Sequence, residues 1–280
     1  MSRPSGRDLF RLYRVRDWLH FLPLPLAGWF AGGRVSFTAL IGGVLGWTFL
    51  LAYMSAINQA FDDRVDRARA DKNPVGRGLR RRQAVLLSLP PAAFALLSVG
   101  VLSPAGLIPA LLILVTATVY SAPPRLKSIP IVGTLWNAVI AVPGLFLADC
   151  PDIAGVPLRV FLGLFVLLLI ASQLIHEAED REDDRAGGIR TVATLAGMKG
   201  ALTAAVVSLS LLPGAAWWLS AGLRERAAIT GAVTVFAAVW VAVLAGRVYR
   251  GDSLALRTLR LRYRYSALIT GLVIFVAATR

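Results

Sequence analysis

The sequence predicts an all-α integral membrane protein, in which nine transmembrane helices form one bundle with two Asp-rich motifs on its cytoplasmic face. The 280 residues are 56% hydrophobic and only 16% charged, with a mean hydropathy of +0.65. Soluble domains are closer to ~45–50% apolar, whereas a transmembrane helix needs about 20 mainly apolar residues. Apolar runs of nearly that length recur along the chain. We therefore expect a single polytopic domain over residues 1–280, preceded by a basic cytoplasmic arm at residues 1–17.

The first candidate span, Trp18–Ala31, follows the arginines of the arm and is closed by Gly32-Gly33. It is short for a complete crossing, but without it the basic arm would lie on the opposite side of the membrane. Polar, Gly/Pro-containing or charged segments separate the later runs. These eight further candidate spans are Phe37–Phe61, Gln83–Leu102, Ala105–Tyr120, Ile129–Leu147, Pro157–Ile175, Lys199–Leu219, Ala227–Val248 and Tyr263–Thr279.

The distribution of basic residues sets the expected orientation. With the arm inside, alternate loops place 25 of the 30 Lys and Arg residues on the cytoplasmic side, as the positive-inside rule predicts. This rule also accounts for the net charge of +14 without a nucleic-acid partner. The same parity brings both acidic segments and the basic pair Arg125/Lys127 to the cytoplasmic face.

The first acidic motif lies where the run Phe37–Phe61 gives way to charged residues. Asn58, Asp62 and Asp66 are spaced i, i+4 and i+8, so in a helix they share one face. Oxygen ligands grouped in this way suit a hard divalent cation such as Mg²⁺. Asp63 and Asp71 lie off that face or beyond it, and we expect solvated or supporting roles for them.

A second acidic segment follows the apolar run Pro157–Ile175, and in it Glu177, Asp180 and Asp184 have i, i+3, i+7 spacing. The two segments together hold ten of the sixteen carboxylates. A solvated loop neutralised by its arginines is the simple alternative. The repeated helical spacing, the shared membrane face, and the position of Asn58 and Glu177 inside apolar runs favour a bound cation cluster.

A diphosphate bound with Mg²⁺ would satisfy both carboxylate sets, since Mg²⁺ usually binds one or two carboxylates together with substrate phosphates. Arg125 and Lys127 could hold the remaining phosphate oxygens, although the two residues could also serve only as topology signals. A diphosphate at the mouth of an apolar bundle implies a hydrophobic tail inside it. An isoprenyl diphosphate has that shape.

Three motifs, in this order, resemble those of the UbiA-type membrane prenyltransferases: Asn58-x-x-x-Asp62-x-x-x-Asp66, Tyr120-Ser-Ala-Pro-Pro-Arg125-Leu-Lys127 and Asp180-Arg-Glu-Asp-Asp184-x-x-Gly187-x-Ile-x-Thr191. Arg14-Val-Arg-Asp-Trp18 is similar to the Arg-Pro-x-x-Trp start of that family. The resemblance implies a nine-helix bundle in which two Mg²⁺ ions bridge the diphosphate to both acidic motifs. The implied metal ligands are Asn58, Asp62, Asp66, Asp180 and Asp184, and the four aspartates are the implied catalytic residues. The implied substrate-binding residues are Asn58, Arg125, Lys127, Lys72, Arg14, Tyr120 and Glu177.

The resemblance implies transfer of a prenyl or polyprenyl group to an acceptor, and we expect an aromatic acceptor of the lipoquinone type. Val15 and Asn73 depart from the prolines and arginines usual at those positions, so the acceptor stays open. One alternative keeps the chemistry with a non-aromatic acceptor such as a carotenoid end, a glycerol phosphate or a phosphoribosyl donor. A second alternative is a carboxylate-based cation transporter. His176 could contact acceptor or diphosphate, or have a hydrogen-bonded structural role.

Overall fold

The computed structural model describes residues 6–31, 36–62, 73–75, 79–148, 156–251 and 256–278. Within those residues the secondary structure is helical, apart from one isolated bridge between Val75 and Leu79. The chain divides into two compact units. The first comprises Met1–Ile129, Val139–Cys150 and Ala186–Ile189, and the second comprises Pro130–Ala138, Pro151–Arg185 and Arg190–Arg280.

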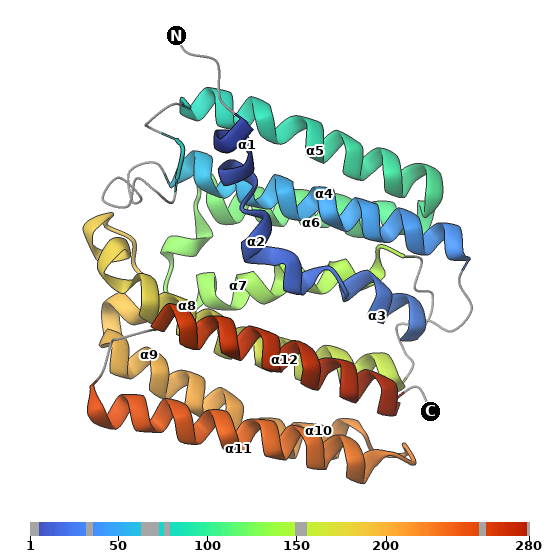
Figure 1. Ribbon diagram of the computed structural model, residues 1–280, viewed down its shortest axis with the longest axis vertical. Helices are drawn as coiled ribbons and strands as arrows, with labels where there is room; N and C mark the ends of the chain where they lie inside the picture. The colour runs from blue at the N-terminus through green and yellow to red at the C-terminus, as the bar shows by residue number, and fades with distance from the viewer. Residues whose placement is uncertain are drawn as a thin grey trace. The chain divides into compact units, whose positions relative to one another are not determined.

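The first unit is built around three long helices, α4, α5 and α6, which pack against one another (Figure 1). Its helices in chain order are α1 (Gly6–Tyr13), α2 (Val15–Trp18), η1 (Leu19–Phe21), α3 (Leu24–Ala31), α4 (Phe37–Phe61), α5 (Arg81–Leu102), η3 (Pro104–Gly106), α6 (Leu107–Ser121), η4 (Leu126–Ser128) and η5 (Val142–Phe146). The short helix α1 lies against α4. Helix α7 (Val132–Ala141) begins in the second unit and ends in the first.

Helix α4 has the beginning and the end that its sequence predicts. The Ser36 hydroxyl caps it by accepting from the backbone N–H of Ala39 at 3.1 Å. At the other end, the N–H of Asp62 donates to the carbonyl of Asn58 at 3.0 Å and closes the last turn. Glycines allow close packing along the helix, since a Cβ on Gly46 would lie 2.3 Å from Val99 of α5.

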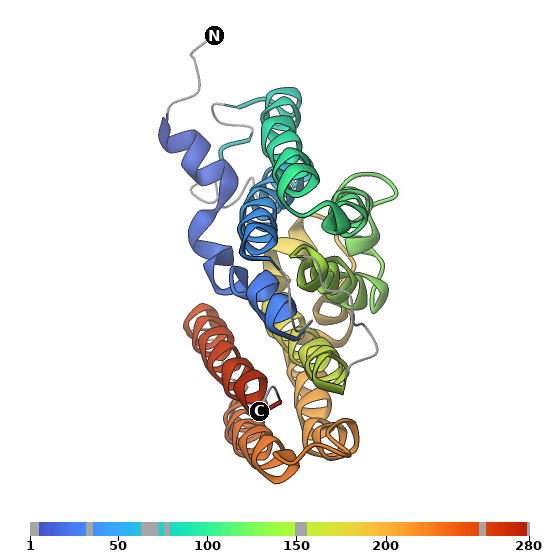
Figure 2. The same cartoon turned by 90° about the vertical axis from the view of Figure 1, so that its right-hand side faces the viewer.

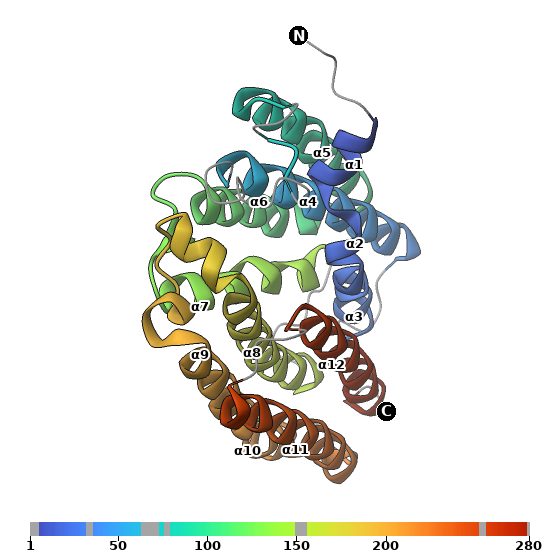
Figure 3. The same ribbon diagram turned by 60° about the vertical axis from the view of Figure 1, so that its left-hand side comes forward.

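The second unit contains helices α8 (Val156–Ala186), α9 (Val192–Ser210), α10 (Leu212–Leu219), α11 (Arg226–Arg250) and α12 (Leu256–Ala278). Helix α11 packs along α9 and α10 (Figure 3). It also contacts α12 beside it (Figure 2). Apolar side chains from these helices form one core, which includes Leu164, Leu209, Phe236 and Tyr263. The Tyr263 hydroxyl donates to the carbonyl of Leu168 at 2.9 Å and ties α12 to α8.

The second acidic segment is helical and is not the loop that its charge indicates. Helix α8 continues past the predicted end of the apolar run at Ile175 and reaches Ala186. The physical reason is that no glycine or proline occurs between Ile175 and Gly187. Gly188 then takes a positive φ of 71°, a conformation that commonly follows a helix end. The acidic side chains are therefore displayed on regular helix.

Among the described residues, six helical segments are long and apolar enough to cross a membrane: Phe37–Phe61, Arg81–Leu102, Pro104–Ser121, Arg159–Ala186, Val192–Leu219 and Arg226–Arg250. Two shorter apolar segments, Leu19–Phe30 and Val132–Phe146, coincide with the predicted first and fifth spans. Helix α12 occupies the position of the ninth span and carries several arginines in its first half. The all-helical membrane fold is thus confirmed, while the count of nine crossings and the single domain stay predictions.

Candidate active site

The first cluster of polar side chains lies in the first unit and comprises Asn58, Asp62, Ser121, Arg125 and Lys127. Lys127 Nζ donates to Asn58 Oδ1 at 2.7 Å and also to Asp62 Oδ1. Arg125 Nη2 donates to the same oxygen of Asp62 at 2.8 Å, and Ser121 Oγ to Asn58 Oδ1 at 3.3 Å. The structure thus brings together two residues of the first acidic motif, Asn58 and Asp62, and the basic pair that the sequence predicts on the same face.

Two segments far apart in the sequence position this cluster. The last turn of α4 carries Asn58, and Asp62 is its C-cap. Arg125 is the N-cap of η4, and Lys127 lies within η4. Arg125 has a left-handed backbone there, with φ 60° and ψ 63°, a conformation that costs a non-glycine residue about 1–2 kcal/mol. Hydrogen bonds from the backbone N–H and the hydroxyl of Ser128 to the Arg125 carbonyl, at 3.0 and 2.7 Å, help to hold it.

The first cluster has the electrostatic properties of a cation-binding site. Lys127 is buried, with 9% of its side chain exposed. The Asn58 amide oxygen and the Asp62 carboxylate oxygen both accept hydrogen bonds from its ammonium group. These two oxygens therefore converge on one position at which a positive charge is stable. Amide and carboxylate oxygens are also the ligands that hard divalent cations use.

A buried glutamine holds the end of α4 in place. The Gln59 side chain is fully buried, and its Nε2 donates to the carbonyls of Arg11 at 2.9 Å and Leu12 at 2.6 Å at the end of α1. Asn73 Nδ2 donates in turn to the Gln59 carbonyl at 3.0 Å. These bonds tie the basic arm and the segment after the first motif to the helix that carries Asn58 and Asp62.

In the second unit, Glu177 is the centre of a buried hydrogen-bond network, with 5% of the residue exposed. Its Oε1 accepts from the Thr134 hydroxyl at 2.6 Å. Its Oε2 accepts from the backbone N–H of Val192, the first residue of α9, at 3.0 Å. Gln173 continues the network, since its Oε1 accepts from Asn137 at 3.0 Å. These contacts join α7, α8 and the start of α9, and they indicate a positioning role for Glu177.

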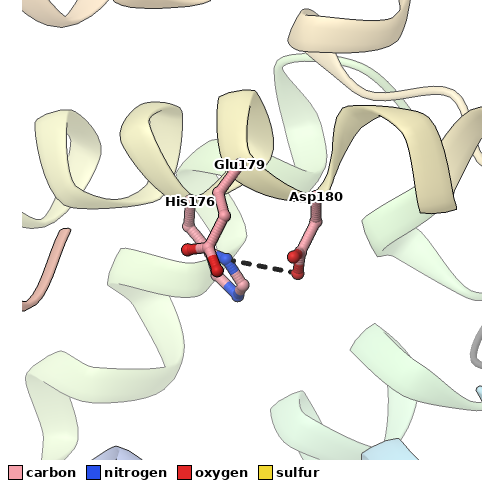
Figure 4. Close-up of side chains that lie close together, drawn as sticks. All are labelled: His176, Glu179 and Asp180. Atoms are coloured by element: carbon pink, nitrogen blue, oxygen red, sulfur yellow. Dashed lines mark ion pairs between the residues drawn. The ribbon is translucent and has the colours of Figure 1, made fainter. Parts of the chain in front are cut away.

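The second cluster also lies in the second unit and comprises His176, Glu179, Asp180 and Arg260. His176, Glu179 and Asp180 project together from α8, and His176 Nδ1 lies 3.4 Å from Asp180 Oδ2 (Figure 4). Arg260 comes from α12, and its Nε lies 3.0 Å from Glu179 Oε2. Its Nη1 donates to His176 Nδ1. This arrangement gives His176 the hydrogen-bonded environment that the sequence left as one of its possibilities.

The other predicted site residues fall in four places, one of which is outside the described residues. Asp66 and Lys72 lie outside the described residues. Asp184 is in the last turns of α8, and Tyr120 is in the last turn of α6. Arg14 joins α1 to α2 with a left-handed backbone, at φ 45°. Predictions of substrate contact at these positions, and at Glu177, stay predictions.

Sequence reasoning missed two residues that the structure places beside the second acidic motif. Arg260 is one of several arginines near the start of α12, and Thr134 is a single hydroxyl in an apolar run. The available signal for Thr134 was a polar residue at the cytoplasmic end of a predicted span. Nothing local distinguishes Arg260 from Arg257 or Arg262.

Comparison with known proteins identifies relatives of this chain. The sequence profile of the UbiA prenyltransferase family matches residues 21–268. A digeranylgeranylglyceryl phosphate synthase of Halobacterium salinarum is 32% identical over 213 residues, which cover 72% of this chain and 74% of the relative. A lycopene elongase/hydratase of the same organism is 33% identical over 211 residues, covering 70% and 74%. The solved structure of a UbiA homolog from Archaeoglobus fulgidus, bound to GPP and Mg²⁺, has a TM-score of 0.77 at 22% identity and covers 96% of this chain and 99% of that one.

Proposed function

Because the chain belongs to the UbiA prenyltransferase family, we propose that it transfers a prenyl group from an isoprenyl diphosphate to a lipid acceptor without an aromatic ring. Membership makes the chain a membrane prenyltransferase, which replaces the cation transporter considered from the sequence. The observation that carries the proposed acceptor is the activity named for the two Halobacterium salinarum relatives, a glycerol phosphate ether synthase and a lycopene elongase. The aromatic acceptor expected from the sequence becomes the alternative that an experiment must exclude.

The donor atoms of the first cluster fit the Mg²⁺ that this activity requires. Asn58 Oδ1 and Asp62 Oδ1 already share one cation, the ammonium of Lys127. The proposed ligands are these two residues with Asp66, Asp180 and Asp184. When bound, Mg²⁺ neutralises negative charge on the diphosphate, which makes it a better leaving group.

The basic pair then has a defined task. In the described contacts, Arg125 and Lys127 each donate to Asp62. A diphosphate offers stronger and more numerous acceptors, and a guanidinium and an ammonium both bind phosphate oxygens well. We therefore assign to Arg125 and Lys127 the binding of phosphate oxygens, and Asp62 would serve as a ligand of the metal.

The reaction follows from these roles. The allylic C–O bond breaks heterolytically, and its electron pair stays on the diphosphate held by Arg125 and Lys127. An electron-rich atom of the acceptor supplies the pair for the new bond to the allylic carbon, and the acceptor then loses a proton. The apolar helices on which the site is built exclude water, which would otherwise capture the allylic cation.

A product screen tests this proposal directly. Purified protein in lipid nanodiscs is incubated with Mg²⁺, an isoprenyl diphosphate and, in separate reactions, a prenylated glycerol phosphate, an acyclic carotenoid and an aromatic acid. Diphosphate release and product mass are measured together, with Asp62→Ala as the control. Prenylated glycerol phosphate or carotenoid supports the proposal, and turnover with the aromatic acid alone overturns the assignment of the acceptor.

A further inference from the structure

We propose that Arg260 is a positioning residue for the second acidic motif. Its guanidinium holds Glu179 and His176 on α8, so that Asp180 rather than these neighbours serves the diphosphate-bound metal. The inference rests on the proposed function, because it assigns to Asp180 the metal role described there. The three motifs that carry the family resemblance end at Thr191, whereas Arg260 lies on the last helix.

Arg260 forms a buried ion pair with Glu179, although the approach of Nε to Oε2 does not have hydrogen-bond geometry. Its Nε lies 3.0 Å from Glu179 Oε2, and only 10% of the arginine side chain and 7% of the glutamate side chain are exposed. The second attachment, from Nη1 to His176 Nδ1, fixes one edge of the imidazole. Removing one partner of a buried ion pair is strongly destabilising, so Arg260 contributes to the stability of the buried Glu179 carboxylate.

The neighbouring side chains explain why such an arginine is needed. One ligand atom from each of His176, Glu179 and Asp180 lies within 4.8 Å of the others, a spacing that could hold a metal ion. A guanidinium keeps its positive charge at any pH that the protein meets. With Arg260 bound to His176 and Glu179, the cation of this cluster is the guanidinium, and both residues are withheld from metal coordination.

The hydrogen bond to His176 has a further consequence for Asp180. Because Nδ1 accepts a hydrogen bond from the Arg260 guanidinium, which can only donate, this nitrogen carries no hydrogen of its own. The 3.4 Å approach of Asp180 Oδ2 to the same nitrogen is therefore a contact with an acceptor and not a hydrogen bond from a neutral histidine. Asp180 is partly exposed, at 25% of its side chain, and thus keeps its carboxylate accessible on the same face of α8.

Removal of the guanidinium should change which metals bind. In Arg260→Met, His176 and Glu179 are released beside Asp180, and an imidazole with two carboxylates suits Zn²⁺ better than Mg²⁺. We expect the Mg²⁺ concentration for half-maximal diphosphate release to rise by roughly 10-fold or more, the usual effect of losing a residue that orients a metal ligand. We also expect micromolar Zn²⁺ to inhibit the variant and not the wild type. Arg260→Lys should lie between the two.

The experiment compares wild type, Arg260→Met, Arg260→Lys and the control Arg262→Met, an exposed arginine on the same helix. Two readouts are taken on each protein: Mg²⁺ titration of diphosphate release, and Mn²⁺ binding by electron paramagnetic resonance without prenyl substrate. The double variant Arg260→Met/Glu179→Leu removes both buried charges, a replacement that buried ion pairs often tolerate. It should unfold at the wild-type temperature and keep the raised Mg²⁺ requirement, since the guanidinium that contacts His176 is gone.

The outcomes separate the two proposals. A raised Mg²⁺ requirement for diphosphate release in Arg260→Met and in the double variant, with altered Mn²⁺ binding and with Arg262→Met like wild type, supports the positioning role. Identical metal titrations for Arg260→Met, the double variant and wild type overturn it, whatever the effect on thermal stability. Wild-type protein that binds Mn²⁺ but releases no diphosphate with any acceptor contradicts the proposed function instead.

Discussion

Lys127 and Asp62 form a buried ion pair at the end of α4, in which the ammonium donates to the carboxylate oxygen that also accepts from Arg125. The Asp62 carboxylate carries one negative charge, whereas Lys127 and Arg125 together carry two positive charges. This relationship links the acidic motif to the basic loop within one unit of the protein.

The first prediction concerns Lys127. Substitution by methionine removes a donor to Asn58 and Asp62, and to the diphosphate under the proposed function. Hydrogen bonds to charged groups contribute about 1.5–3 kcal/mol, so kcat/KM for the isoprenyl diphosphate should fall by roughly 10- to 100-fold. Lys127→Arg should retain part of the activity. Lys199→Met, at an exposed lysine of α9, is the control, and equal kinetics for the two methionine variants would mean that Lys127 is only a topology signal.

A second prediction concerns Glu177, whose carboxylate accepts from Thr134 and from the first N–H of α9. Glu177→Ala leaves both donors without this acceptor, and each unsatisfied buried donor costs about 1–3 kcal/mol. The unfolding temperature in detergent should fall, and amide exchange at the start of α9 should accelerate. Glu182→Gln is the matched control, because the Glu182 side chain is 74% exposed. A Glu177→Ala protein with wild-type stability and lost activity would instead favour the substrate contact expected from the sequence.

The third prediction concerns the attachment of α1. Gln59→Leu removes both hydrogen bonds to the end of α1 while it keeps the buried volume. The rate of hydrogen–deuterium exchange at residues 6–13 should rise by at least ten-fold. A loss of ~1.4 kcal/mol of local stability from the two hydrogen bonds together corresponds to a ten-fold change. Gln59→Glu should have the same effect, because a carboxylate cannot donate to carbonyls. The control Gln83→Leu alters a local bond at the start of α5, and unchanged exchange of α1 in Gln59→Leu would contradict the assignment.

Close packing of α3 gives a fourth prediction. A Cβ at Gly28 would lie 1.6 Å from the carbonyl oxygen of Leu145 in η5. Gly28→Ala must therefore displace backbone, which costs at least the ~1–3 kcal/mol typical of overpacking. Gly231→Ala is the control, since nothing lies within 4 Å of its Cβ position and alanine favours a helix by about 0.5–1 kcal/mol. In detergent, the melting temperature should fall for Gly28→Ala and rise slightly for Gly231→Ala. Similar melting temperatures for the two variants would contradict the close approach of Gly28 to Leu145.

Much of this architecture follows from local sequence. The apolar run from Phe37 and the cap at Ser36 define α4, and alternation of basic loops places Arg125 and Lys127 on the side of Asn58 and Asp62. Such features depend on composition and spacing alone. The structure adds their hydrogen bonds, and it shows that the charge-rich end of α8 is helix because the first breaker is Gly187.

Long-range packing accounts for what sequence reasoning missed. Arg260 lies 84 residues from His176 in the chain, among arginines that look alike by composition. Arg260 is buried because α12 packs against α8. Similarly, the short run Ile129–Leu147 reads as one span, but Pro143 near the start of η5 divides it into α7 and a 3-10 segment.

The central claim is that the two acidic motifs act together on one metal-bound diphosphate. The most direct test is Mg²⁺-dependent diphosphate release by wild type, Asp62→Ala and Asp180→Ala in nanodiscs, with Glu182→Ala as the control for an acidic residue of α8. The account predicts that each aspartate variant, although folded, loses nearly all release, while the control retains it. Wild-type release by either Asp62→Ala or Asp180→Ala would contradict the account.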